Sequence, residues 1–155
     1  MSMKITATER IKASVEKVFE VFSDVKKSAV HISGIEQVKV VSDTKKGKGL
    51  RWRETRTMMG KQATEEMEIT EMSPPNSYIV EASSHGMHYT TRFFFDNKGE
   101  NRTDVTWEFY AKPTTIITKL TSPIFYVVFK RMTTKALKQD MLDLKKYIEE
   151  QERAT

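Results

Sequence analysis

The chain has 155 residues, of which 38% are hydrophobic and 30% are charged, and its formal net charge is +5. This balance indicates one globular domain over residues 1–155. It excludes a disordered or membrane-spanning chain, because no stretch approaches the roughly 20 apolar residues that a membrane helix needs. The absence of cysteine excludes disulfides, thiolate metal sites and cysteine nucleophiles. The amino terminus lacks the apolar core of a secretory signal, so the expected location is the cytoplasm.

The excess of positive charge is concentrated in two segments, at 45–48 and 130–138. Surface charge most often serves solubility. Neither segment has the dense basic face with interleaved aromatic residues that is typical of a nucleic-acid site. We therefore expect no nucleic-acid partner.

The first third of the chain predicts a strand and two short helical segments. Alternation of apolar and polar residues over 4–11 is typical of a strand with one solvated face. Ser14 has the residue type and the position of an N-cap for the short helix that follows. A second short helical or irregular segment over 26–32 is expected to end at Gly34.

Between residues 36 and 111 the apolar pattern changes to a period of two. We expect six strands there, at 36–43, 49–59, 62–72, 77–84, 87–96 and 103–111. Short segments rich in glycine, proline, asparagine and lysine separate them and are typical of tight turns. Consecutive strands should therefore pair in antiparallel fashion.

The last third predicts one long helix, from Ser122 to about Gln151. Apolar residues recur every three or four positions and form one stripe: Phe125, Phe129, Met132, Ala136, Leu137, Met141, Leu144 and Ile148. Ser122 and Pro123 are compatible with an N-cap and first turn, and equally with a kink in a helix that begins earlier. A helix of about 45 Å needs an extensive sheet as its partner, and a sheet curved around it encloses space for a small molecule.

These elements predict an α+β fold, and several motifs resemble a known family. They are Gly47-x-Gly49-Leu50-Arg51-Trp52-Arg53-Glu54-Thr55-Arg56, the Gly60 turn, 66–71, Pro74-Pro75, 103–107 and 142–145. Together they resemble the polyketide cyclase/dehydrase-like branch of the START-like superfamily over nearly the whole chain. The resemblance implies the helix-grip fold, in which a seven-stranded antiparallel sheet curves around the carboxy-terminal helix and two short helices follow the first strand.

The resemblance also implies a cavity for a hydrophobic ligand, such as a lipid, a polyketide, a sterol or a quinone-like molecule. Members of the family include cyclases, lipid carriers, hormone receptors and co-chaperones, so the fold implies no single function. This branch has no shared set of catalytic residues, and the catalytic residues are therefore left unassigned. We expect no cofactor.

Trp52, Glu54, Arg56 and Met58 share one face of the strand at 49–59. Because Trp52 is the least suited of these to water, this face should point toward the cavity. Glu54 and Arg56 would then supply a polar anchor or an acid/base group in an apolar pocket. The alternative is a salt bridge at the rim or on the outer surface of the sheet, since buried charges are costly and uncommon.

Large apolar residues in phase on the later strands and on the helix complete the expected lining. The candidate ligand-binding residues are Trp52, Glu54, Arg56, Met67, Tyr89, Phe93, Trp107, Phe109, Phe125, Phe129 and Met132. The same residues would suit a packed core, so core and pocket remain alternatives for each. The nine methionines favour a lining that adapts to variable apolar ligands.

The three histidines, His31, His85 and His88, lack the neighbouring ligands of a metal site, and we expect no metal. His31 or His88 is chemically suited to act as a general base, because imidazole titrates near neutrality, but the sequence shows no partner for either. The glycines form no phosphate-binding loop, and no serine lies in a nucleophile elbow.

The segment 124–131, with 116–120 before it, is apolar on nearly all sides. It could pack beneath the two short helices, dock a second subunit in a homodimer, or touch a membrane surface through its basic residues. The leading hypothesis for function is the binding of a hydrophobic small molecule between sheet and helix. The alternatives are a polyketide cyclase or dehydratase that uses Glu54 or His88, and a protein or membrane-surface adaptor working through 116–131.

Overall fold

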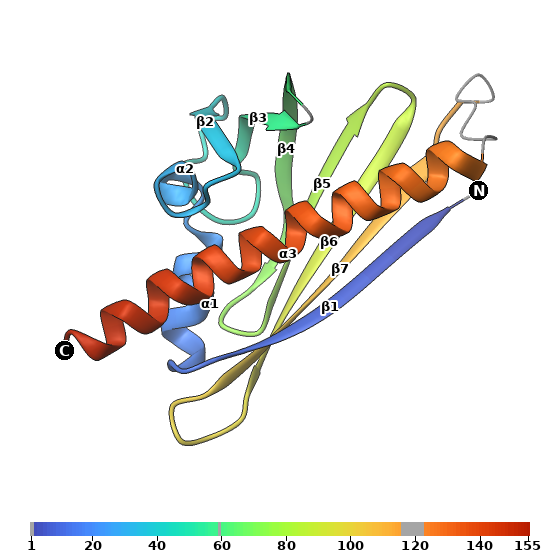
Figure 1. Ribbon diagram of the computed structural model, residues 1–155. Coiled ribbons are helices and arrows are strands. Elements are labelled where there is room, and N and C mark those ends of the chain that lie inside the picture. Colours follow the sequence, from blue (N-terminus) through green and yellow to red (C-terminus); the bar gives the residue numbers. More distant parts are fainter. Residues whose placement is uncertain (1, 59, 116–122) are drawn as a thin grey trace.

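The computed structural model describes residues 2–58, 60–115 and 123–155. Within these residues, three short elements follow the first strand, and six further strands and one long helix come after them (Figure 1). Their bounds are β1 (Met3–Ile11), α1 (Val15–Ser23), the 3-10 helix η1 (Val25–Lys27), α2 (Ser28–His31), β2 (Ile35–Val40), β3 (Arg51–Met58), β4 (Lys61–Ser73), β5 (Ser77–Ser84), β6 (Met87–Asn97), β7 (Thr103–Pro113) and α3 (Pro123–Arg153).

The seven strands form one antiparallel sheet in the order β1-β7-β6-β5-β4-β3-β2. Five of the six pairs of adjacent strands are also consecutive in the sequence. The sixth pairs β1 with β7, from Met3 opposite Ala111 to Ile11 opposite Thr103. The long helix α3 crosses one face of the curved sheet, and α1 and α2 lie beside its carboxy-terminal half (Figure 1). The predicted α+β helix-grip fold is confirmed.

The predicted strand at 77–84 coincides with β5, and most other strand ends lie within a few residues of their predicted positions. The largest differences flank the turn between β2 and β3, where the expected strands 36–43 and 49–59 are shorter. There the Ser42 hydroxyl donates to the Thr44 carbonyl at 2.6 Å and accepts from the Arg51 amide at 2.8 Å. One more backbone hydrogen bond, from the Val41 amide to the Arg51 carbonyl at 2.9 Å, follows the last paired residues. Beyond it the side-chain hydrogen bonds of Ser42 take the place of the regular ladder, and both strands end earlier than expected.

The hydrophobic core is built where α1 and the carboxy-terminal half of α3 meet the sheet. Ser14 caps α1 by accepting from the Lys17 amide at 3.3 Å, as the sequence predicts. The largest side chains with almost no exposure include Trp107 on β7 and Ile148 on α3. A smaller cluster of Val25, Leu50, Trp52 and Ile69 packs at the other end of the sheet.

Polar contacts fix α3 to the segments around the short helices. The Asp143 carboxylate accepts from the amide of Ser33 at 2.9 Å and from its hydroxyl at 2.7 Å. The Glu149 carboxylate accepts from the Lys12 amide at 2.9 Å. Whether a helix precedes Pro123 depends on residues 116–122, which lie outside the described residues.

The first turns of α3 differ from one expectation. Ile124 is 77% exposed, and Phe125, Val127 and Val128 are each about half exposed, at 49%, 51% and 48%. The short helices lie beside the opposite half of α3 (Figure 1). The expectation that 124–131 packs beneath them is therefore wrong for these residues, and 116–120 lie outside the described part of the chain.

No helix in the described part is long and apolar enough to cross a membrane.

Candidate functional site

A cavity of about 320 Å³ lies between the sheet and α3. Small-molecule sites in proteins have volumes of about 300–1,000 Å³. Its wall consists of the inward-facing side chains of β3 to β7, the cavity-facing side of α3 and several residues from α1 to β2. The inward set alternates along each strand, so burial follows the period of two that the sequence shows.

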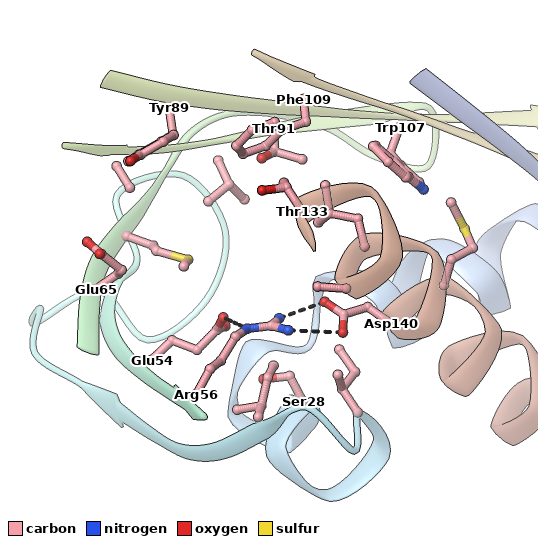
Figure 2. A pocket seen from close by; sticks show the side chains of 18 of the residues that line it. Ser28, Glu54, Arg56, Glu65, Tyr89, Thr91, Trp107, Phe109, Thr133 and Asp140 are labelled. Atoms are coloured by element: carbon pink, nitrogen blue, oxygen red, sulfur yellow. Dashed lines mark hydrogen bonds and ion pairs between the residues drawn. The ribbon is translucent and has the colours of Figure 1, made fainter. Parts of the chain in front are cut away.

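A group of three charged side chains, the Glu54–Arg56–Asp140 group, forms one part of the wall (Figure 2). The Arg56 guanidinium donates from Nε to Glu54 Oε2 at 2.7 Å. It also donates from both Nη atoms to the Asp140 carboxylate, at 3.0 and 2.6 Å. A Cβ added to Gly34 would lie 3.2 Å from Nη1, so the glycine leaves room for this guanidinium.

These side chains are largely withdrawn from water, with exposed fractions of 8% for Glu54, 19% for Arg56 and 14% for Asp140. Burial alone would lower the pKa of Arg56, but its hydrogen bonds and charge interactions with Asp140 and Glu54 outweigh burial and raise that pKa. Burial raises the pKa of the Asp140 carboxyl, against the opposing effect of Arg56. One cation is thus shared by two carboxyl groups at the cavity wall.

Further polar groups line the cavity at a distance from this group. Glu65 and the Tyr89 hydroxyl lie at one end, and Thr91 and Thr133 face each other from β6 and α3 (Figure 2). Burial, followed by the charge of Glu65, raises the pKa of the Tyr89 phenol. The rest of the wall is mainly apolar, so these few polar groups can orient a ligand.

Both tryptophans belong to the cavity wall and are almost fully buried, with 3% of Trp52 and 2% of Trp107 exposed. The Trp52 indole nitrogen lies 3.5 Å from Glu54 Oε1, at the limit of a hydrogen bond. Within the described residues, the Trp107 indole N–H has no hydrogen-bond partner. Such an orphan donor costs about 1–3 kcal/mol.

The comparisons with known proteins agree with this architecture. A family model described as polyketide cyclase / dehydrase and lipid transport matches residues 2–149. The chain belongs to this family. None of the curated proteins that were compared with the chain matches it.

Solved structures of this family's fold superpose on nearly the whole chain. An aromatase/cyclase from a Streptomyces species is similar with a TM-score of 0.83 at 14% identity, covering 96% of this chain and 94% of that chain. Norcoclaurine synthase from Thalictrum flavum gives 0.76 at 14% identity, with 98% and 97% covered. A START superfamily protein from Mycobacterium smegmatis gives 0.75 at 12% identity, with 95% and 97% covered.

Within this member of the polyketide cyclase/dehydrase family, every predicted ligand-binding residue except Phe125 lines the cavity. Those that do are Trp52, Glu54, Arg56, Met67, Tyr89, Phe93, Trp107, Phe109, Phe129 and Met132. Phe125 lies outside the lining, with its ring stacked on Phe129 at a centroid distance of 6.0 Å. The expected salt bridge between Glu54 and Arg56 exists, but it faces the cavity and not the outer surface of the sheet.

Asp140 is the principal site residue that the sequence analysis missed. It lies four residues after Ala136 and four before Leu144, so helical spacing places it in the apolar stripe. A carboxylate within such a stripe requires a buried partner, and this was the available signal.

His88 does not lie in the cavity, so it cannot serve as a base there, and that hypothesis is corrected. Its Nδ1 forms a hydrogen bond of 2.7 Å with the Ser83 hydroxyl, and its Nε2 lies 3.0 Å from Glu81. Residues 81, 83 and 88 alternate with lining residues 82 and 89, which places them on the outer face of the sheet. His31 is also outside the lining and stacks on Tyr147 at 3.7 Å.

The chemistry available at the cavity is therefore acid–base chemistry and polar anchoring. The described residues contain no group of three or more histidine, aspartate or glutamate side chains placed to hold a metal ion. Three carboxyl groups, one guanidinium and several hydroxyls face an apolar space. The carboxyl groups can bind or release a proton, and all of these groups can orient the polar end of a ligand.

Proposed function

We propose that this protein binds a hydrophobic small molecule, such as a lipid, a polyketide or a quinone-like compound, in the cavity between the sheet and α3. The observation that carries this proposal is an open, mainly aromatic and aliphatic space with one ion-paired group in its wall. Burial of apolar ligand surface would contribute about 25 cal/mol per Å². The Glu54–Arg56–Asp140 group would orient the polar end.

A cyclase or dehydratase acting in the same cavity is the second candidate. The raised pKa of Asp140 supports it, because a carboxyl that keeps its proton nearer to neutrality is suited to general acid catalysis. In a dehydration, a carboxylate such as Glu54 would take a proton from a carbon next to a carbonyl. Asp140 would give its proton to the departing hydroxyl, which leaves as water.

Native mass spectrometry of freshly purified protein tests the proposal. We expect an additional mass that remains bound under native conditions and is released on denaturation. Ala136→Phe, which places a ring in the cavity wall, should abolish this additional mass. Lys135→Phe adds the same ring at an exposed position of α3 and serves as the matched control.

Retention of the additional mass in Ala136→Phe would contradict binding in this cavity. The same measurement separates the two candidates. A bound compound whose mass is unchanged after incubation with the protein supports binding alone, whereas loss of the mass of one water supports a dehydratase.

The exposed start of α3 supports a further role at a surface. Ile124, Phe125, Val127 and Val128, here called the α3 apolar patch, are followed by exposed Lys130 and Arg131. Apolar side chains beside cations suit an anionic membrane surface, reached from the cytoplasm that the sequence predicts. We propose this membrane contact as an accompaniment to ligand binding.

Cosedimentation with lipid vesicles tests the membrane contact. We expect the protein to sediment with phosphatidylserine-containing vesicles more than with phosphatidylcholine vesicles, and Ile124→Ser with Val128→Ser to remove the difference. Leu142→Ser changes an exposed apolar residue elsewhere on α3 and should have no effect. Concentration-dependent dimerisation that the double substitution abolishes, without vesicle binding, would instead indicate a homodimer interface.

A further inference from the structure

The cavity wall has an excess of negative charge within the described residues. Glu54, Glu65 and Asp140 contribute three carboxyl groups, and Arg56 contributes one guanidinium. With all four ionised the net charge of the wall is −3 + 1 = −2. If Asp140 keeps its proton, one excess negative charge remains. The whole chain carries +5, so the charge of the wall is opposite in sign to that of the protein.

Arg56, the single cation among the described residues of this wall, is already engaged. Arg56 directs its Nε toward Glu54 and both Nη atoms toward Asp140, at distances of 2.6 to 3.0 Å. A bidentate pair with a carboxylate is the strongest arrangement that a guanidinium makes in proteins. A ligand carboxylate would have to displace one of these protein carboxylates, and would then leave that carboxylate buried without a partner.

Acceptor atoms, by contrast, are available at two places in the wall. Among the described residues, Glu54 Oε1 has only the long 3.5 Å contact with the Trp52 indole, while its other oxygen binds Arg56. Within the described residues, no side chain donates a hydrogen bond to Glu65, which lies near Tyr89 at the other end of the cavity (Figure 2). A carboxylate in apolar surroundings gains most from a donor or a positive charge.

We infer that the cavity selects ligands whose polar end is a cation or a hydrogen-bond donor, above all a protonated amine, and that it disfavours carboxylates of the same size. This inference rests on the proposed binding function and names the ligand class. The overall positive charge of the protein would attract anions, so a preference for cations has to come from the cavity itself.

Titration with three ligands of equal chain length tests this inference. Decylamine, decanol and decanoate share one apolar body and differ in the charge of the polar end. We expect calorimetry near neutral pH to give the tightest binding for decylamine and the weakest for decanoate, with about a tenfold difference between the two. Equal affinities, or tighter binding of decanoate, would overturn the inference.

Two neighbouring substitutions on β4 identify the source of the preference. Glu65→Gln removes a charge from the cavity wall and should reduce the amine-to-carboxylate ratio at least about threefold, with little effect on decanol. Glu66→Gln removes the same charge from the outer face, where Glu66 lies 3.6 Å from Arg53, and should leave the ratio unchanged. A ratio that is unchanged in both Glu65→Gln and Glu54→Gln also overturns the inference.

The outcomes separate this inference from the function on which it rests. Binding of none of the three ligands would count against ligand binding in the cavity. Binding of decanol with no preference for the amine would overturn the charge selectivity alone. Retained decanol binding in each variant shows that the variant is folded with an intact cavity.

Discussion

Arg56→Met is expected to lower the free energy of unfolding by about 3–5 kcal/mol at neutral pH, because it leaves buried carboxylates without their cation. Glu54 and Asp140 are only 8% and 14% exposed, so water cannot replace the lost hydrogen bonds in full. The methionine keeps much of the apolar stem and limits any loss of packing. Urea denaturation followed by far-UV circular dichroism measures the effect.

Arg53→Met is the matched control, since Arg53 lies three residues earlier on the outer face of β3. Its ion pair with Glu66 spans 3.6 Å between side chains that are 57% and 47% exposed. Exposed pairs of this kind contribute about 0–1 kcal/mol. A loss in Arg56→Met no larger than in Arg53→Met would show that water solvates the Glu54–Arg56–Asp140 group.

The loss in Arg56→Met should also depend on pH. Without Arg56, burial raises the folded-state pKa of Asp140 further above its unfolded value of about 3.9. A carboxyl with a raised folded-state pKa is best tolerated below its unfolded pKa, and stability is lost as pH rises through the folded value. The variant should therefore lie closest to the wild type near about pH 4 and furthest from it above neutrality.

The two halves of this ion-pair group differ in how far the sequence could predict them. Glu54 and Arg56 lie two residues apart on one strand, so the period of two places them on one face. Asp140 pairs with Arg56 across 84 residues of sequence. Helical spacing puts Asp140 in the apolar stripe, but the choice of partner depends on where α3 crosses the sheet, which no local pattern fixes.

The difference between local pattern and contacts set by the overall fold also explains why the surroundings of His88 were not predicted. His88 meets Glu81 and Ser83 only because β5 and β6 pair with Ser83 opposite His88. The strands and their turn were predictable from local residues, whereas the register decides which side chains meet and which face they occupy. The cavity itself is even less predictable from the sequence, because the same aromatic residues would fill a packed core if α3 lay closer to the sheet.

Trp52→Phe is expected to lower the free energy of unfolding by about 1–3 kcal/mol, toward the lower end of core truncations. Trp52 packs with Val25, Leu50 and Ile69 on one side, so the smaller ring leaves part of this cluster unfilled. Its other side faces the cavity, where fewer contacts are lost. Trp52 therefore belongs both to the packed core and to the cavity lining, which the sequence analysis treated as alternatives. Urea denaturation measures the loss in the free energy of unfolding.

The same substitution is expected to remove most of the change in indole fluorescence that an apolar ligand such as decanol produces. Trp52 lines the cavity beside the Glu54–Arg56–Asp140 group, where the polar end of a ligand would lie. Trp107→Phe is the comparison variant, because it removes the other indole of the cavity wall, which lies on β7 and is not in contact with the Glu54–Arg56–Asp140 group through any hydrogen bond of the described residues. It should leave much of the ligand-dependent change in place. A large stability loss in Trp52→Phe, with no ligand-dependent fluorescence from the wild type or either variant, would show that this face is packed core and not a binding site.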